Sequence, residues 1–326
     1  MKINRLQPKL VVVTGAGSGI GRATAVKFAK LGAHVVVSDI DLASADETVA
    51  IIRSNGDKAS AALLDVTDAD AWEQFATAVR SDFGVADVLV NNAGFVLAGA
   101  FLDMSPGDWE RQLGPNLMGV VWGSRVFGRQ MAERGKGHIV NIASAASYNP
   151  VPGTSAYNVS KAGVRMLTDC LRVELGPKGV SASSICPGVI RTNLARNAQS
   201  AGIDAGLFDR GVDVTQLAGK ALDALPFELF GPNLVANAAV RAVRFDLDVV
   251  PVRTEAWVTY GLYRIAPSLT RGVLRNFPVD RLEAAGARAL ALLDRFIPTQ
   301  AGDPLQSSIA DFTANGHAVP SQESFT

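Results

Sequence analysis

Cysteine and histidine are scarce in this sequence. Its 326 residues include 2 cysteines, Cys170 and Cys186, and 3 histidines. The cysteines form no CxxC pair, and no histidine has an acid or a cysteine at metal-ligand spacing, so we expect buried, reduced thiols and no metal site. Thiols of this kind are typical of a reducing compartment, and we therefore predict a cytoplasmic protein.

The sequence also lacks long apolar runs and an excess of charge of either sign. No run approaches the about 18 apolar residues of a transmembrane helix, and "MKINRLQPKLVVVTG" at the start does not resemble a signal peptide. The 31 Lys and Arg residues balance 31 Asp and Glu residues, which leaves no net attraction to nucleic acid or to an anionic membrane. We expect a small-molecule substrate, no nucleic acid and no membrane association.

Short β-branched runs alternate with amphipathic helical stretches along most of the chain. The runs occupy residues 10–15, 34–39, 60–66, 87–92, 138–144, 180–188 and 246–252. Nearly continuous apolar strands that are separated by helices are typical of a parallel sheet covered on both faces. The pattern predicts an α/β fold, a doubly wound parallel sheet of seven strands with a helical C-terminal extension.

The same pattern predicts the domain organisation. Residues 1–252 form a single domain, in which 190–235 is a long crossover on the substrate side. Residues 253–297 form a helical extension that packs on this domain, and the polar segment 298–326 is loosely ordered. Leu282, Ala285, Ala289, Leu292 and Phe296 recur at helical spacing in the extension. We expect this face to pack on its own domain or on a second subunit rather than on a membrane.

A glycine-rich turn follows the first predicted strand. In "TGAGSGIG" the glycines let the backbone approach a pyrophosphate at a helix N-terminus, and Asp39 ends the next strand. The Asp39 carboxylate can accept hydrogen bonds from ribose hydroxyls and repels a 2′-phosphate. Neither Ser18 nor Ile40 supplies a cation for such a phosphate, and Arg22 is expected to be a solvated surface group. The predicted cofactor is therefore NAD.

The stretch "SAYNVSKAG" places Tyr157 and Lys161 four residues apart, on one face of a helix. A free tyrosine has a pKa of about 10. A nearby ammonium and a cationic nicotinamide both favour the phenolate, which predicts a lowered pKa for Tyr157 and a role in proton transfer. Ser144 ends the strand at 138–144, where an open parallel sheet presents its ligands, and its hydroxyl can hold the substrate oxygen. Ser147 is the competing candidate.

Taken together and in order, these motifs resemble one family. They are "TGAGSGIG", "DV" at 65–66, "NNAG" at 91–94, Asn116, Ser144, "YNVSK" at 157–161 and "PGVIRT" at 187–192. From residue 9 to 252 the chain resembles a short-chain dehydrogenase/reductase. The resemblance implies a Rossmann fold and an oxidoreductase that transfers a hydride between NAD and a secondary alcohol or ketone. It also implies a catalytic centre of Ser144, Tyr157 and Lys161, assisted by Asn116.

The resemblance also implies individual roles. It places Asp65 and Val66 beside the adenine, Asn91 and Gly94 along the adenosine, and Thr192 near the nicotinamide amide. Lys161 would bind the nicotinamide ribose. The full set of predicted cofactor-binding residues is Gly15, Gly17, Ser18, Gly19, Ile20, Gly21, Asp39, Asp65, Val66, Asn92, Ala93, Gly94, Tyr157, Lys161, Pro187, Gly188, Val189, Ile190 and Thr192.

In the family, the residue at the Asn116 position supports a water relay to the lysine from a discontinuity in a helix. Pro115 directly before it favours a helix start or a kink there. The apolar crossover leads us to expect a lipophilic substrate. The alternative function is a non-catalytic NAD-binding scaffold or redox sensor. For assembly we expect a homodimer through residues 116–133 and 155–176, with a tetramer as the alternative.

Overall fold

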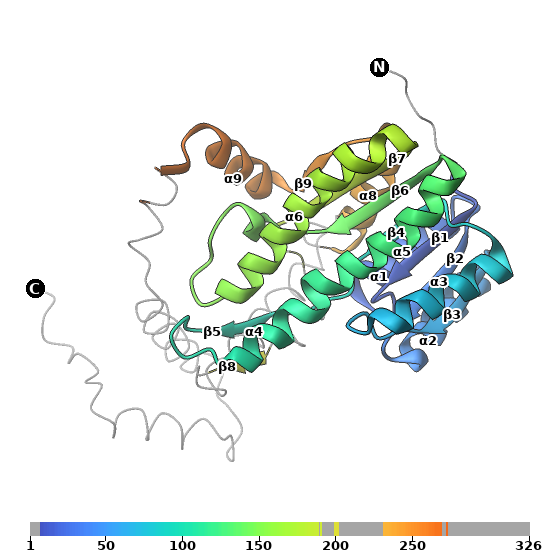
Figure 1. Cartoon of the computed structure of the whole chain (residues 1–326), viewed down its shortest axis with the longest axis horizontal. Coiled ribbons are helices and arrows are strands. Elements are labelled where there is room, and N and C mark those ends of the chain that lie inside the picture. The colour runs from blue at the N-terminus through green and yellow to red at the C-terminus, as the bar shows by residue number, and fades with distance from the viewer. Residues whose placement is uncertain (1–6, 189, 191–198, 202–230, 269–271, 273–326) are drawn as a thin grey trace, which may run out of the picture.

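A single parallel sheet forms the centre of the protein. The computed structural model describes residues 7–188, 190, 199–201, 231–268 and 272 (Figure 1). The sheet has 7 strands in the order β3-β2-β1-β4-β6-β7-β9, and each neighbouring pair is parallel. The strands are β1 Leu10–Thr14, β2 His34–Asp39, β3 Ala59–Leu63, β4 Val88–Asn91, β6 Gly137–Ile142, β7 Val180–Pro187 and β9 Val249–Val252. The fold predicted from the sequence is confirmed.

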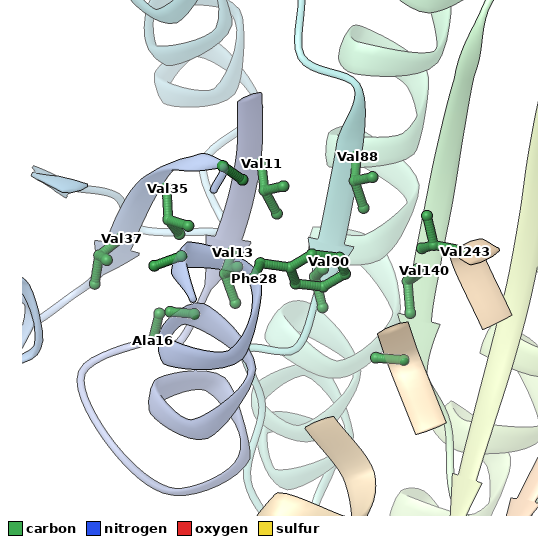
Figure 2. Packing of buried hydrophobic residues seen from close by; sticks show 14 of the residues in the cluster. Val11, Val13, Ala16, Phe28, Val35, Val37, Val88, Val90, Val140 and Val243 are labelled. Atoms are coloured by element: carbon green, nitrogen blue, oxygen red, sulfur yellow. The ribbon is translucent and has the colours of Figure 1, made fainter. Parts of the chain in front are cut away.

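The sheet is buried on both faces because its strands are rich in valine. Successive side chains of a strand point to opposite faces. Val11 and Val13 of β1 therefore join one core cluster, and Val12 joins the other. Figure 2 shows the first cluster, in which the Phe28 ring lies against the valines of the central strands.

Helices cover both faces of the sheet. On one face lie α1 Gly19–Ala29, α2 Leu42–Ser54 and α8 Asn233–Phe245, which contribute Phe28, Ile52 and Val235 to the first core cluster. On the other face lie α3 Ala69–Phe83, α5 Gly119–Arg134 and α6 Ser155–Leu175, with the fully buried Trp72 and Phe127 at their centre. The two layers are the doubly wound arrangement that the strand order requires.

The strand order reverses between β1 and β4, because β2 and β3 lie on one side of β1 and the later strands lie on the other. Ligands of open parallel sheets bind at the carboxyl ends of the strands at such a switch point. The glycine-rich turn after β1 and the "NNAG" segment after β4 both lie there. The topology therefore brings together motifs that are about 75 residues apart in sequence.

Several shorter elements surround the site. They are α4 Pro106–Leu113, the π-helix η1 Gly114–Met118, the 3-10 helices η2 Ala145–Ser147 and η3 Gly176–Lys178, and α9 Thr254–Ile265. A small parallel pair, β5 Leu97–Gly99 with β8 Gln199–Ala201, was not expected from the sequence. Three-residue strands are too short to show an alternating pattern.

The predicted extension begins with α9, which is helical. The rest of the extension from 273 to 297, the tail 298–326 and most of the crossover 190–235 lie outside the described residues. The domain boundaries therefore stay a prediction. Within the part of the chain that the structure describes, no helix is both long and apolar enough to cross a membrane.

One expectation about the cysteines is wrong. Both thiols are free, and Cys186 is buried in β7, but Cys170 is exposed. Cys170 lies on the face of α6 that points away from the sheet, and the apolar residues near it in sequence did not reveal which face this was. No group of acids, cysteines and histidines in the described residues could hold a metal ion.

Candidate active site

The glycine-rich turn after β1 is tightly constrained. Gly15 has a φ of +59°, a conformation that glycine adopts without strain. A Cβ on Gly21 would lie 2.1 Å from the Gly15 carbonyl oxygen, and one on Gly15 would lie 2.8 Å from Ala93 Cα. These glycines leave an open concavity beside the N-terminus of α1, whose N–H groups suit a phosphate.

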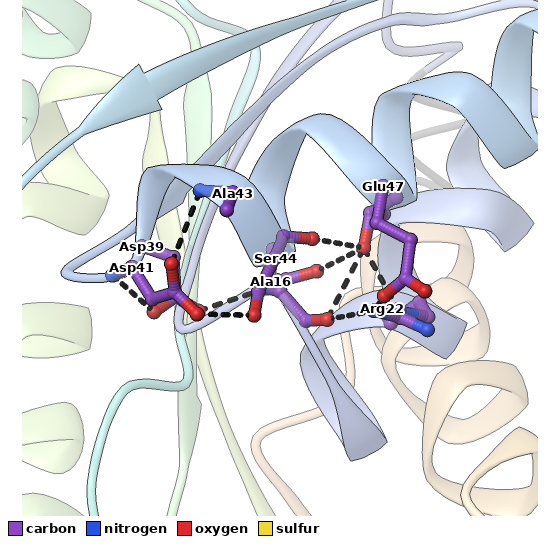
Figure 3. Close-up of polar contacts among 9 residues, drawn as sticks. Ala16, Arg22, Asp39, Asp41, Ala43, Ser44 and Glu47 are labelled. Carbon is purple, nitrogen blue, oxygen red and sulfur yellow. Dashed lines mark hydrogen bonds and ion pairs between the residues drawn. The ribbon is translucent and has the colours of Figure 1, made fainter.

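Asp39 lies against this turn, at the end of β2. Its Oδ2 accepts a hydrogen bond from the Gly17 N–H at 2.8 Å, and its Oδ1 accepts one from the Asp41 N–H at 3.1 Å (Figure 3). A Cβ on Gly17 would lie 2.9 Å from the same carboxylate. The acid and the glycine turn therefore form one unit, as a site for the adenosine ribose requires.

Arg22 is not the solvated surface group that we expected from the sequence. Its guanidinium donates to the Gly17 carbonyl and to Thr48 Oγ1, and it pairs with the Glu47 carboxylate (Figure 3). Thr48 Oγ1 in turn donates to the Ala16 carbonyl at 2.9 Å. Arg22 thus links the glycine-rich turn to α2. The ion pair with Glu47 engages the charge of Arg22, which is the cation of this turn.

The "NNAG" segment is tied to the same turn. The Asn92 side-chain amide donates to the carbonyls of Thr14 and Gly15 at 2.9 and 3.0 Å, and the Ala93 N–H donates to Thr14 Oγ1 at 3.1 Å. Asn91 behaves differently. Its side chain is buried at the carboxyl end of the central strand β4 and donates to Asn141 Oδ1 at 2.8 Å, so it does not line the cavity that the cofactor would fill.

Ser144, Tyr157 and Lys161 converge at the carboxyl end of β6. Ser144 caps η2, and its Oγ accepts a hydrogen bond from the Ala146 N–H at 3.1 Å. Tyr157 and Lys161 lie on one face of α6, with Lys161 Nζ 5.8 Å from the centroid of the Tyr157 ring. The Tyr157 hydroxyl forms a hydrogen bond with the Ser144 side chain. Ser147, the competing serine, is buried beside Cys186 and does not line the cavity.

The pKa of Tyr157 departs from its ordinary value in the direction opposite to our prediction from the sequence. Burial raises this pKa, and the hydrogen bond with Ser144 lowers it by less. Lys161 Nζ donates instead to the Ile142 carbonyl at 2.9 Å. Burial also lowers the pKa of Lys161, to about 8. Desolvation of the phenolate therefore outweighs the hydrogen bond with Ser144 in setting the pKa of Tyr157.

Asn116 lies in the π-helix η1, at the discontinuity that Pro115 predicted. Its side chain is fully buried, with Oδ1 accepting from the Phe95 N–H at 3.0 Å and Nδ2 donating to the Phe95 carbonyl at 2.9 Å. Nδ2 also reaches Ser160 Oγ at 3.4 Å. Asn116 therefore holds the chain just after "NNAG" rather than facing the cavity directly. Single-turn π segments of this kind are common at functional sites.

One cavity of about 1260 Å³ joins these groups. Most predicted residues line it: Gly15, Ser18, Gly19, Ile20, Asp39, Asp65, Val66, Asn92, Ala93, Gly94, Ser144, Tyr157, Lys161, Pro187, Gly188 and Ile190. Gly17, Gly21 and Asn116 support its walls without lining it. Val189 and Thr192 lie outside the described residues.

The cavity also has lining residues that the sequence did not reveal. They are Phe95, Arg111, Asn149, Thr154, Glu255 and Thr259, among others. Phe95 directly follows "NNAG", and Thr154 directly precedes "SAYNVSKAG". Their positions next to these motifs could have indicated that they line the cavity. Glu255 and Thr259 lie about 100 residues beyond Tyr157, in α9, and no motif marks them.

Comparison with known proteins identifies the family. The sequence model described as "short chain dehydrogenase" matches residues 9–202. The chain belongs to the short-chain dehydrogenase family. The seven-stranded Rossmann fold and the cavity at its switch point agree with membership of this family.

Individual relatives agree. "Probable oxidoreductase EphD" of Mycobacterium tuberculosis is 45% identical over 270 residues, which cover 82% of this chain but 44% of that protein. The chain thus spans less than half the length of this relative. A short-chain dehydrogenase/reductase of Burkholderia phymatum in complex with NAD has a TM-score of 0.68 at 31% identity, covering 79% of this chain and 93% of that one.

A metagenomic short-chain oxidoreductase in complex with NADP has a TM-score of 0.60 at 28% identity and covers 76% of this chain and 96% of that one. Solved relatives thus bind either dinucleotide. The choice between the two depends on this chain's own residues.

Proposed function

We propose that this protein is an NAD-dependent dehydrogenase that interconverts a secondary alcohol and a ketone. The observation that carries the proposal is the convergence of Ser144, Tyr157 and Lys161 on the cavity that the glycine turn and Asp39 also line. The turn and the acid fit the pyrophosphate and the adenosine ribose, and the three side chains lie where the substrate would meet the nicotinamide.

In the proposed oxidation, the substrate hydroxyl binds between Ser144 and Tyr157. The bound NAD⁺ supplies the acceptor for the hydride that leaves the alcohol carbon. Tyr157 takes the hydroxyl proton as the carbon–oxygen double bond forms, and Ser144 holds the oxygen. The Lys161 ammonium favours the phenolate and binds the nicotinamide ribose, and Asn116 fixes the adjoining wall. In reduction Tyr157 returns the proton.

The preference for NAD rests on Asp39 and Arg22. The Asp39 carboxylate favours ribose hydroxyls over a phosphate, and Arg22, the nearest cation of the loop, already pairs with Glu47. We also propose a lipophilic substrate, a cytoplasmic location and a homodimer. The apolar crossover in the sequence supports the lipophilic substrate. The free thiols support the cytoplasmic location, and the exposed apolar face of α6 supports the homodimer.

A panel of secondary alcohols and ketones, assayed by NADH absorbance, tests the function. We expect NAD-linked turnover of at least one alcohol and little with NADP. The second candidate is a dinucleotide-binding scaffold or redox sensor, for which a buried tyrosine with a raised pKa is a specific observation. Tight NAD binding without turnover of any alcohol or ketone would favour that candidate.

A further inference from the structure

Helix α9 forms one wall of the cavity, and part of its inward side is polar. Glu255 and Thr259, one turn apart, line the cavity. On the outward side, Trp257 and Val258 are 55% and 54% exposed. Ala256 and Tyr260 of this helix pack inward, as on a helix that covers a core. Glu255 and Thr259 add polar groups at the place where the substrate would bind.

The Glu255 carboxylate is held in position. Arg253 Nε lies 2.5 Å from Glu255 Oε1 in an ion pair, and the Arg253 side chain is only 18% exposed. The same oxygen lies against Gly188, where an added Cβ would meet the Glu255 carboxylate. Arg253 has a φ of +85°, a conformation that non-glycine residues rarely adopt and that persists where the surroundings enforce it.

The wall is also connected to the catalytic segment. Tyr148, at the end of the 3-10 helix that Ser144 begins, donates its hydroxyl to the Ala256 carbonyl at 3.0 Å. Its ring packs on Tyr260 with centroids 5.4 Å apart. Glu255 is the neighbour of Ala256, so one hydrogen bond fixes its position relative to Ser144. Gly188 on its other side follows Pro187 at the end of β7.

We propose that Glu255 is a specificity-determining residue that recognises a hydroxyl or amide N–H on the substrate, away from the carbon that is oxidised. A carboxylate only accepts hydrogen bonds, and among the described residues its partner is Arg253 through Oε1 alone. Oε2 is therefore available to a donor, and the negative charge disfavours an acidic group at the same place. Thr259 adds a hydroxyl on the same wall. This inference rests on the proposed function and adds a substrate class to it.

Matched substrates and matched variants test the proposal. Secondary alcohols are assayed in pairs that share one carbon skeleton and differ by a second hydroxyl, such as cyclohexanol and the cyclohexanediols. Glu255→Leu removes the acceptor, and Glu255→Gln keeps its size and one oxygen but loses the charge. Glu73→Gln is the control, because Glu73 is also paired with an arginine, at 2.7 Å from Arg125, but lies outside the cavity.

We expect the wild-type protein to prefer the dihydroxylated member of some pairs. In Glu255→Leu the ratio of kcat/KM within such a pair should fall by roughly 10-fold or more, because hydrogen bonds to charged groups are the stronger ones. The ratio in Glu255→Gln should lie between those of wild type and Glu255→Leu, and the ratio in the Glu73→Gln control should match wild type. The affinity for NAD⁺, measured by titration calorimetry, should not change in any variant, and the Glu73→Gln control should also keep the turnover of both alcohols.

Two results would overturn the proposal. One is a wild-type protein that shows no preference for the diol in any pair, or a Glu255→Leu variant whose ratio of kcat/KM equals that of wild type in every pair. The other is an equal loss for both members together with weaker NAD⁺ binding, which would assign Glu255 to the cofactor. If wild type turns over nothing, the proposed function fails instead. Calorimetry of the same pairs with NADH-loaded protein then decides the role of Glu255, since a lost preference for the diol in Glu255→Leu still supports it.

Discussion

The Tyr157 hydroxyl and the Lys161 ammonium show how strongly burial shapes the chemistry of single residues. Both lie on the inner face of α6, and both have pKa values displaced toward the neutral form by loss of solvation. The neutral tyrosine suits proton donation in ketone reduction. Alcohol oxidation requires the phenolate, so its rate should depend on groups that stabilise that charge, above all Lys161.

Replacing Tyr157 by phenylalanine should abolish hydride transfer and leave NAD binding intact, because the change removes the proton-transfer group and little else. We expect a loss in kcat of ~10²–10⁴-fold, the usual contribution of general acid–base catalysis. The control is Tyr263→Phe, since Tyr263 lies on α9 and its ring contact with Tyr148 survives the change. A Tyr157→Phe variant that kept most of its turnover would remove Tyr157 from the mechanism.

Replacing Asp39 by alanine should narrow the preference for NADH over NADPH. The change removes the carboxylate that favours ribose hydroxyls and repels a 2′-phosphate. A hydrogen bond to a charged group is worth roughly 1.5–3 kcal/mol. Titration calorimetry with both cofactors measures the effect, with Asp46→Ala on the exposed side of α2 as control. Tighter binding of NADPH than NADH by the wild-type protein would contradict the prediction.

His138 should make stability depend on pH. Its side chain is buried beside Ser183, and burial lowers the pKa from 6.5 to about 4. Between these values the unfolded chain binds more protons than the folded one, so stability should fall as the pH drops from about 6.5 to about 4. The loss should be on the order of 3 kcal/mol at most.

Urea unfolding across this pH range measures the effect. His138→Gln should flatten the dependence, whatever its effect on stability at neutral pH. His34→Gln, at a partly exposed histidine, should retain most of it. An unchanged slope in His138→Gln would assign the acid sensitivity to other groups.

Among the secondary-structure elements, the π-helix η1 holds the chain segment that follows β4. It directs the Asn116 amide to both backbone groups of Phe95, while Gln112 from α4 donates to the same carbonyl and accepts from the Leu97 N–H. The two side-chain amides thus provide hydrogen-bond partners for the backbone of residues 95–97, which form no part of the main sheet. Their spacing of four residues places them on one helix face.

Replacing Asn116 by leucine should destabilise the protein by about 1–3 kcal/mol, because the Phe95 N–H would lose its buried partner. Urea unfolding measures this change. Met118→Ala, at a partly exposed side chain in the same turn, is the control. We also expect weaker turnover, since the segment held by Asn116 adjoins Gly94 in the cavity wall. Wild-type stability in the Asn116→Leu protein would show that water replaces the amide.

On the surface of the protein as a whole, the outer face of α6 is unusually apolar. Val159, Met166 and Val173 recur every seven residues and are 49%, 54% and 76% exposed. Apolar stripes at this spacing are typical of helix–helix contacts. The stripe belongs to one of the two segments through which we predicted a homodimer.

Met166→Glu should therefore convert the dimer to a monomer in light scattering, because a charge would be buried at the centre of the interface. Leu31→Glu is the control. Leu31 is 57% exposed and follows α1 on the other face of the sheet. A monomeric wild-type protein, or a dimer that survives the Met166→Glu change, would place assembly elsewhere.

Local patterns in the amino-acid sequence were sufficient to predict the sheet and the glycine turn, and they indicated most of the residues that line the cavity. Valine-rich runs are buried wherever they pair, and glycine, tyrosine and lysine were recognisable because their chemistry depends on neighbours a few residues away. The folded structure was needed for the raised pKa of Tyr157, the clamp of Arg22 on Glu47, the exposure of Cys170 and the approach of Glu255 to Gly188. Each of these depends on segments that are distant in sequence, and burial and charge act through space rather than along the chain.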